Sequence, residues 1–207
     1  IHTSLLPKYR GSSPIQYALL NGDKLTGVSL QKMVKKMDAG DIVKSLEVEV
    51  YDYDDLSSLS SKLKSKSAEL IHQFIDDLYH NNLTYSPQDP SGVSFAPLIK
   101  KEDGLLDFFN DDAKTLVNKA RAFHPWPGTH CYLNGEILKV LRVEIFEEHK
   151  TLLPGAIDIS SNQLIVGTKN GCLRLMTVQK KGKKPCSDIE FLNGHKNKYN
   201  KFEITQD

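Results

Sequence analysis

The sequence has little of what builds secreted miniproteins, metal centres or membrane spans. Its 207 residues include three cysteines, Cys131, Cys172 and Cys186, with no CxxC spacing among them. We therefore expect neither a disulfide framework nor a structural zinc, and a reducing compartment is favoured. No apolar run approaches the roughly 18 residues that a membrane-spanning helix needs. The first residues lack a basic stretch followed by an apolar one, so we expect no signal peptide there.

What is present is typical of a folded globular protein, with 39% hydrophobic and 26% charged residues. At this length, one large or two small domains are expected. The net charge of +1 conceals an uneven distribution along the chain. Residues 169–201 carry nine Lys and Arg against Asp188 and Glu190, a balance of 9 − 2 = +7. Such an excess suits a phosphate backbone, and the alternative is a solvated, lysine-rich hairpin tip.

The first part of the chain alternates helical and strand patterns. Ser13-Pro14 is a typical start for a short helix over about 14–21. Residues 26–34 and 42–50 read as strands, and a long amphipathic helix follows from the capping pair Asp54-Asp55 to about His80. This alternation predicts an α/β unit with a mainly parallel sheet over residues 1–81.

Pro and Gly residues interrupt any periodicity after this unit, which predicts a linker over 82–101. A second domain is expected over 102–207. It should begin with a helix at about 112–123 and a turn in which Trp126 anchors the core. Short strands then follow, separated by turn pairs such as Asn134-Gly135, with a final helix that begins at a capping box and ends at Gly194. This pattern predicts a small β-barrel of OB type, a fold that can bind oligonucleotides. The strands are expected at 131–133, 136–145, 156–159, 163–167 and 172–178.

Two motifs at a characteristic distance carry the functional signal. The chain begins with His2-Thr3-Ser4-Leu5-Leu6-Pro7, and Asp38-Ala39-Gly40 follows 36 residues after His2. Together they resemble the signatures of folate-dependent formyltransferases, in which Asn-x-His-x-Ser-Leu-Leu-Pro is followed at this distance by Asp-x-Gly. Arg10-Gly11-x-x-Pro14 adds to this resemblance.

The resemblance implies a reaction and a site. Moving a formyl group from 10-formyltetrahydrofolate to an amine creates an oxyanion, which needs a positioned hydrogen-bond donor and a proton shuttle. His2 and Asp38 are the expected catalytic pair, because a carboxylate beside an imidazole stabilises its protonated form. Asp41 is the rival for the carboxylate role. By the same resemblance Ser4, Leu5, Leu6 and Pro7 line the folate site, and no metal is expected.

The sequence departs from the family pattern at its start. The family's Asn stands two residues before the His, whereas this sequence begins one residue before His2. We therefore expect a fragment: the C-terminal half of a Rossmann-like formyltransferase domain, followed by the OB-like domain. Losing one oxyanion donor costs about 100- to 1,000-fold in rate, so the fragment alone could be an inactive tRNA-binding piece.

The second half resembles the members that formylate methionyl-tRNA for translation initiation. Features in common include the Pro125-Trp126-Pro127-Gly128 turn, Gly182-Lys183-Lys184 and Phe191-Leu192-Asn193-Gly194. The resemblance implies initiator methionyl-tRNA as partner, no membrane partner, a monomer, and a bacterial cytoplasm or organelle matrix. The alternative enzyme is a sugar-nucleotide formyltransferase, which shares the first domain and the turn. The residues expected to contact tRNA are Arg10, Lys180, Lys181, Lys183 and Lys184.

Overall fold

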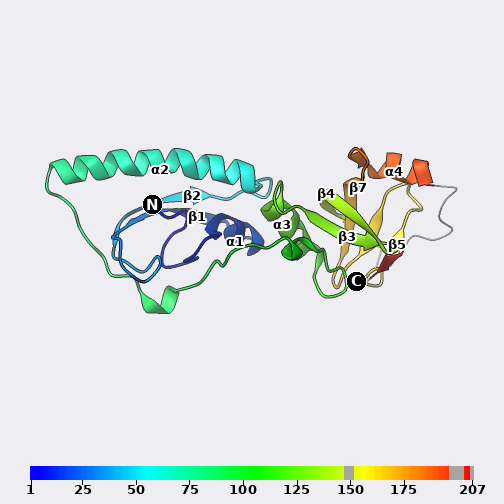
Figure 1. The fold of residues 1–207 in the computed structure, drawn as a ribbon, viewed down its shortest axis with the longest axis horizontal. Coiled ribbons are helices and arrows are strands. Elements are labelled where there is room, and N and C mark those ends of the chain that lie inside the picture. Colours follow the sequence, from blue (N-terminus) through cyan, green and yellow to red (C-terminus); the bar gives the residue numbers. More distant parts are fainter. Residues whose placement is uncertain (147–151, 196–202, 206–207) are drawn as a thin grey trace. The chain divides into compact units, whose positions relative to one another are not determined.

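The chain forms two compact units, Ile1–Ile99 and Lys100–Asp207, in a computed structural model that describes residues 1–146, 152–195 and 203–205. Figure 1 shows a helix-and-strand unit at the N-terminal end and a mainly β unit at the C-terminal end. Within the described ranges, no helix combines the length and the apolar character needed to cross a bilayer.

The first unit is built from a strand pair and two helices: α1 (Pro14–Leu20), β1 (Leu25–Gln31), β2 (Ile42–Glu49) and α2 (Leu56–Tyr79). The strands pair antiparallel, with Leu25 opposite Glu49 and Gln31 opposite Ile42. The expectation of a mainly parallel sheet is wrong for this pair. The connection over residues 32–41 reverses the chain and is too short for the crossover that parallel neighbours need.

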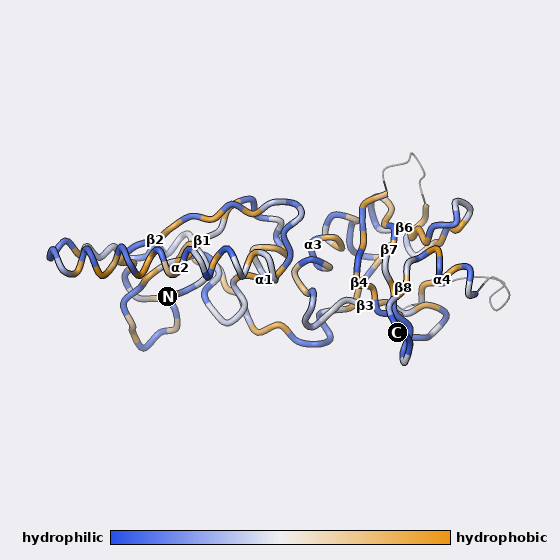
Figure 2. Tube along the Cα trace, turned by 90° about the horizontal axis from the view of Figure 1, so that it is seen from above, coloured by the Kyte–Doolittle hydropathy of each residue, from blue (hydrophilic) through white to orange (hydrophobic). Residues whose placement is uncertain are grey.

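Helix α2 begins and ends where the apolar periodicity predicted. Asp55 accepts a hydrogen bond from the Ser58 amide at 2.8 Å, and the Ser58 hydroxyl accepts one from the Asp55 amide at 3.0 Å, which closes a capping box. The buried Leu59, Leu63 and Leu70 share one face of the helix, which contacts β1 and β2. Figure 2 shows hydrophobic and hydrophilic residues alternating along this helix.

Most of the stretch expected as a linker packs within the first unit. Ser86 exchanges both backbone hydrogen bonds with Ile42, and the backbone near Phe95 pairs with Arg10. Ala96 and Ile99 are buried. A short 3-10 helix, Pro90–Gly92, lies between these contacts. Residues 82–99 therefore form an extended segment that runs back along the first unit, and we call it the return segment.

The second unit is an antiparallel, barrel-like sheet with helices beside it. The strands lie in the order β5-β6-β7-β4-β3-β9, and β8 pairs with the C-terminal part of β7. The long β4 and β7 form its centre, with Val140 opposite Val178 and Ile145 opposite Leu173. The elements are η2 (Glu102–Gly104), α3 (Ala113–Phe123), β3 (Thr129–Leu133), β4 (Glu136–Phe146), β5 (Ile157–Asp158), β6 (Ile165–Gly167), β7 (Cys172–Lys180), β8 (Cys186–Ser187), α4 (Asp188–His195) and β9 (Ile204–Thr205).

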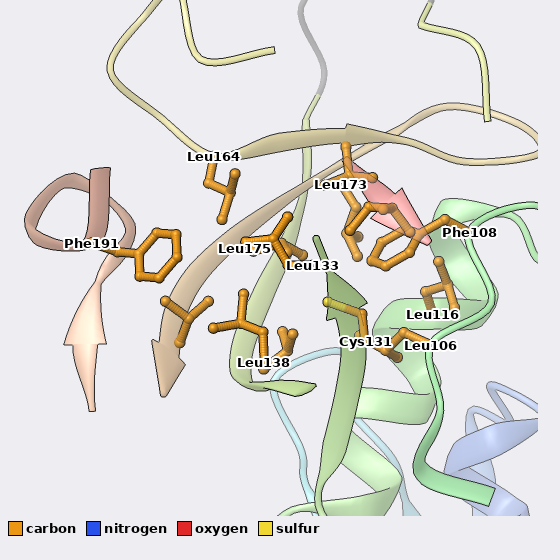
Figure 3. Packing of buried hydrophobic residues seen from close by; sticks show 14 of the residues in the cluster. Leu106, Phe108, Leu116, Cys131, Leu133, Leu138, Leu164, Leu173, Leu175 and Phe191 are labelled. Carbon is orange, nitrogen blue, oxygen red and sulfur yellow. The ribbon is translucent and has the colours of Figure 1, made fainter. Parts of the chain in front are cut away.

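The core of this unit lies between the sheet and α3 (Figure 3). Phe108 and Leu116 from the helical side meet Leu133, Leu173 and Leu175 from the strands, all nearly or fully buried. Trp126, predicted as a core anchor, is 54% exposed in the turn between α3 and β3, so that prediction is wrong. The core is filled instead by the aliphatic residues of the strands and by Phe108 and Phe191.

Two local predictions in this unit are confirmed. Asn134 and Gly135 both have positive φ, 51° and 75°, and join β3 to β4 in a two-residue hairpin. At the start of α4, the Ser187 amide donates to Glu190 at 2.9 Å and the Glu190 amide donates to the Ser187 hydroxyl at 3.2 Å. This reciprocal pair is the predicted capping box.

Candidate active site

The first loop of the chain is fixed to β1 through Ser29. The backbones of His2 and Ser29 exchange two hydrogen bonds, each 2.8 Å long. The Ser29 hydroxyl donates to the Ser4 carbonyl at 2.7 Å and accepts from the Leu6 amide at 3.1 Å. One buried serine therefore holds both the histidine and the turn after it, and His2 is positioned by a strand rather than by a free terminus.

Gly27 of β1 lies against both the first loop and the backbone of β2. A Cβ atom at Gly27 would lie 2.5 Å from Leu5 Cδ2 and 2.2 Å from the Leu46 carbonyl oxygen. Both contacts are too short for real atoms. The contact with the Leu46 carbonyl is a backbone clash, so a side chain at position 27 would disturb the pairing of β1 with β2 and would also displace the Leu5 side chain.

Asp38 lies near the end of the loop between β1 and β2, in a left-handed backbone conformation with φ of 50°. The loop closes at its base, where the Lys32 amide donates to the Asp41 carbonyl at 2.9 Å. The Asp38 carboxylate turns inward. Its Oδ2 accepts from the Gly11 amide at 2.9 Å and its Oδ1 accepts from Gln31 Nε2 at 2.8 Å.

The two residues predicted as the catalytic pair are neighbours in space. His2 Nδ1 lies 3.6 Å from Asp38 Oδ1, and the two side chains are 8% and 19% exposed. His2 Nε2 lies 2.8 Å from the Tyr9 carbonyl oxygen. A carbonyl can only accept, so Nε2 carries the proton of this hydrogen bond. The nitrogen that faces the carboxylate is Nδ1, and the structure places Asp38 beside it.

Tyr9 fixes the far side of the first loop. Its hydroxyl donates to Asp23 at 2.7 Å and accepts from Asn21 at 2.8 Å. Burial is the largest influence on this phenol, and together with the Asp23 carboxylate it raises the pKa of Tyr9 to about 12, against the Asn21 hydrogen bond. Tyr9 therefore stays neutral and structural, and it holds its carbonyl against the imidazole.

A single glutamine in the return segment joins both loops. Gln88 Nε2 donates to the backbone carbonyls of Asp38 at 2.9 Å and Gly40 at 2.7 Å. Its Oε1 accepts from Arg10 Nη2 at 2.7 Å and Nε at 3.1 Å. Arg10 is buried at 7% exposure, so it acts as a clamp between loops. Its burial gives no support to the expected contact with tRNA.

The residues expected at the folate site divide into two pairs. Ser4 and Leu6 are buried, and the Ser4 hydroxyl donates to the Lys8 carbonyl at 2.6 Å, which stabilises the turn. Leu5 and Pro7 are partly exposed. Of the four, Leu5 and Pro7 have surface to offer a ligand, whereas Ser4 and Leu6 shape the loop from within.

The four lysines of the basic cluster line one hollow of about 740 Å³ in the second unit. Lys181, Lys183 and Lys184 are exposed around the turn after β7. Lys180 is partly buried and lies 3.0 Å from Glu136. Three of the four are thus exposed as expected, and the hollow also contains the apolar Ile137 and Phe191.

Sequence reasoning did not find Gln31, Gln88 or Tyr9. Gln31 follows Ser29 by two residues on β1, and strand alternation was the signal that could have placed it on the loop side. The Gln88 side chain bonds distant carbonyls and Arg10, and Tyr9 acts through its backbone carbonyl; neither leaves a pattern in a single sequence. No cluster of three or more potential metal-ligating His, Cys, Asp and Glu side chains occurs where the structure is described.

Comparison with known proteins assigns both units. Residues 1–75 match the family model described as formyl transferase, and residues 98–196 match the one described as formyl transferase, C-terminal domain. A methionyl-tRNA formyltransferase of Thermodesulfovibrio yellowstonii is 39% identical over 196 residues, and one of Levilactobacillus brevis is also 39% identical over 196 residues. These matches cover 95% and 94% of this chain, which spans 62% of the length of each relative.

Solved structures share the fold at lower identity. HypX from Aquifex aeolicus in complex with tetrahydrofolic acid matches with a TM-score of 0.68 and 17% identity, over 99% of this chain and 38% of that one. WlaRD, a sugar 3N-formyl transferase crystallised with dTDP and 5-N-formyl-THF, matches with a TM-score of 0.66 and 18% identity, over 88% of this chain and 65% of that one.

Proposed function

The chain belongs to the formyltransferase family, and from this premise we propose that it serves the transfer of a formyl group from 10-formyltetrahydrofolate to the α-amino group of methionyl-tRNA. The observation that carries the proposal is the meeting of His2 and Asp38, which are 36 residues apart in sequence and 3.6 Å apart in space. The names of the relatives at 39% identity favour methionyl-tRNA as the acceptor.

We propose a role for each group of the pair, and the geometry supports it. Nε2 of His2 is held by the Tyr9 carbonyl, so Nδ1 is the nitrogen that can gain and lose a proton. At 3.6 Å the carboxylate of Asp38 stabilises a charged imidazole without occupying Nδ1 in a direct hydrogen bond. The Nδ1 proton is therefore free to stabilise the developing oxyanion or to move to the leaving nitrogen.

The test is formyl transfer by the intact gene product with His2→Ala or Asp38→Ala. Each variant should lose most of its turnover, since one removes the proton carrier and the other the charge that stabilises it. Asp41→Ala is the matched control, because Asp41 lies in the same loop and was the rival carboxylate. Turnover near the wild-type level in either His2→Ala or Asp38→Ala would exclude that residue from the reaction.

The formyl donor is expected to bind beside the first loop, where Leu5 and Pro7 are partly exposed. The solved relative with bound tetrahydrofolic acid has the same fold and supports folate as the donor class. Ser4 and Leu6 would act indirectly, by holding the loop that Leu5 and Pro7 belong to. Equilibrium binding of 10-formyltetrahydrofolate to Leu5→Ala and Leu6→Ala variants would separate direct contact from loop support.

The basic hollow of the second unit is the proposed contact for the tRNA backbone. Lysines that bind phosphates supply affinity without reading the bases, so every tRNA should weaken alike when they are removed. A variant with Lys181, Lys183 and Lys184 changed to Ala should reduce the slope of log affinity against log salt by about 1 per lost contact. A variant with Lys64 and Lys66 of α2 changed to Ala is the control. An unchanged slope would instead favour the solvated hairpin.

The alternative acceptor is the amine of a nucleotide sugar, which the solved sugar formyltransferases support through their fold. Competition between methionyl-tRNA and dTDP-amino sugars in one transfer assay discriminates between them.

We further propose that the first unit is the C-terminal half of a Rossmann-like domain and that the barrel-like unit is of OB type. A monomer working in a bacterial cytoplasm or organelle matrix completes the proposal. A chain inactive alone but able to bind tRNA remains the third alternative.

A further inference from the structure

We infer that Gln31 is a positioning residue of the proposed formyl transfer: its amide fixes the carboxylate of Asp38 toward His2, while its side-chain oxygen accepts a hydrogen bond from a buried water. This inference rests on the proposed function. It concerns a residue outside both sequence motifs, at the C-terminal end of β1.

Three alternating residues of β1 organise the site from one side. Gly27 admits Leu5 of the first loop, and Ser29 holds the backbone of that loop at Ser4 and Leu6. Gln31 continues this row and donates to Asp38 Oδ1 at 2.8 Å. A single strand thus positions the loop of the imidazole and the carboxylate that faces it.

The orientation of the Gln31 amide follows from its partner. A carboxylate only accepts hydrogen bonds, so Nε2 must face Asp38 and Oε1 must point to the other side. Oε1 is buried and has no hydrogen-bond partner among the residues that the structure describes. A buried acceptor without a partner is unfavourable and uncommon in native proteins, which indicates a partner outside the described protein groups. An ordered water is the donor that fits a fully buried oxygen.

The carboxylate is held from two sides, and each oxygen has its own donor. The backbone amide of Gly11 donates to Oδ2 at 2.9 Å. This hydrogen bond stays in place when the side chain of Gln31 is changed. Gln31 binds Oδ1, the oxygen that faces His2 Nδ1. Without the amide of Gln31, Oδ1 can turn into direct contact with the imidazole or away from it, and in both cases the Nδ1 proton is misplaced.

The experiment compares Gln31→Met and Gln31→Glu in the intact gene product, using 10-formyltetrahydrofolate and methionyl-tRNA. Methionine keeps the length and lacks the donor, whereas glutamate keeps the shape and adds a negative charge beside Asp38. Gln73→Met is the matched control, because Gln73 makes the same type of bond, to Glu69 at 3.2 Å, on an exposed face of α2. A hydrogen bond to a charged group predicts a loss of about 10- to 100-fold in kcat for both Gln31 variants.

Both KM values and the thermal midpoint of Gln31→Met should equal those of the wild type, because the residue acts on the reacting geometry and not on binding. Wild-type kcat in Gln31→Met, or a lowered midpoint with unchanged kcat per folded molecule, would overturn the inference. If Gln31→Met does not fold, the kcat of Gln31→Glu decides in the same way. Absence of transfer by the wild-type protein would count against the proposed function itself and is distinguishable from both results.

Discussion

Gly40→Ala should displace the carboxylate of Asp38, the proposed partner of His2, while leaving the rest of the chain folded. A Cβ atom at position 40 would lie 1.8 Å from the Lys32 carbonyl oxygen, whereas real Cβ contacts are not shorter than 3.0 Å. The base of the loop must therefore open by at least 3.0 − 1.8 = 1.2 Å. Lys32 and Gly40 lie at the two ends of the loop that carries Asp38, and Gly40 is only two residues from Asp38. The displacement is therefore expected to move the carboxylate.

The magnitude follows from the sensitivity of catalysis to geometry. A misplacement of about 1 Å can cost roughly 100-fold in rate, which corresponds to about 2.7 kcal/mol in the activation free energy. The opening also strains the bonds from Gln88 to the carbonyls of Asp38 and Gly40. We expect a fall of about 100-fold in kcat, with binding of the formyl donor less affected.

The assay is single-turnover formyl transfer to methionyl-tRNA, together with thermal unfolding of the same preparation. Gly194→Ala is the control, because a Cβ at position 194 in α4 would meet nothing within 4 Å among the described residues outside its own helix backbone and chain neighbours. A folded Gly40→Ala protein with kcat within a few-fold of the wild type would refute the reasoning. It would mean that the loop relaxes without moving Asp38, or that the position of Asp38 does not limit the reaction.

Three further predictions concern stability. Asp55→Ala removes the N-cap of α2 and should lower the free energy of unfolding by about 1 kcal/mol, measured by urea titration. Leu175→Ala removes a fully buried side chain from the second core and should cost about 2–5 kcal/mol in the same measurement. Burial acts to raise the pKa of Asp188, but the hydrogen bond from Arg174 and those from backbone amides hold it below its usual value. A lowered folded-state pKa stabilises the unit above about pH 4 and loses that effect on acidification, so Asp188→Asn should show a smaller stability loss than the wild type as the pH falls.

The parts of the fold that depend on local signals were predictable from the sequence. The Asn134-Gly135 turn and the α2 capping box both arise from backbone preferences of adjacent residues, and both lie where the pattern put them. Strand alternation does not give the direction of β2 beside β1, because it is the same in parallel and antiparallel pairs. The shortness of the connection between the two strands was the signal that could have given it. The prediction for Trp126 was wrong because the presence of a large aromatic residue in a turn does not show whether that turn faces the core or the solvent.

For the site, the sequence led to His2 and Asp38 through motif and spacing, and the structure brings them together. It did not lead to the residues that hold them. Gln88 reaches Asp38 and Gly40 across about fifty positions, and its partner Arg10 was expected at a nucleic-acid surface. Such support depends on tertiary contacts of the Gln88 side chain with distant carbonyls and with Arg10, and periodicity and composition contain no information on them.

During synthesis, the return segment is translated after the loops that it supports. The imidazole and carboxylate loops lie within the first 41 residues, yet the groups that tie them together, from Ser86 through Gln88 to Ala96, are translated only after the whole of α2. A nascent chain that stops at the end of α2 therefore contains His2 and Asp38 with their local partners Ser29, Gly11 and Gln31, but lacks Gln88, which joins the Asp38 loop to Arg10. The order of translation thus delays the last supports of the loops that carry His2 and Asp38 until the chain has passed the point where its sequence suggests that the domain ends.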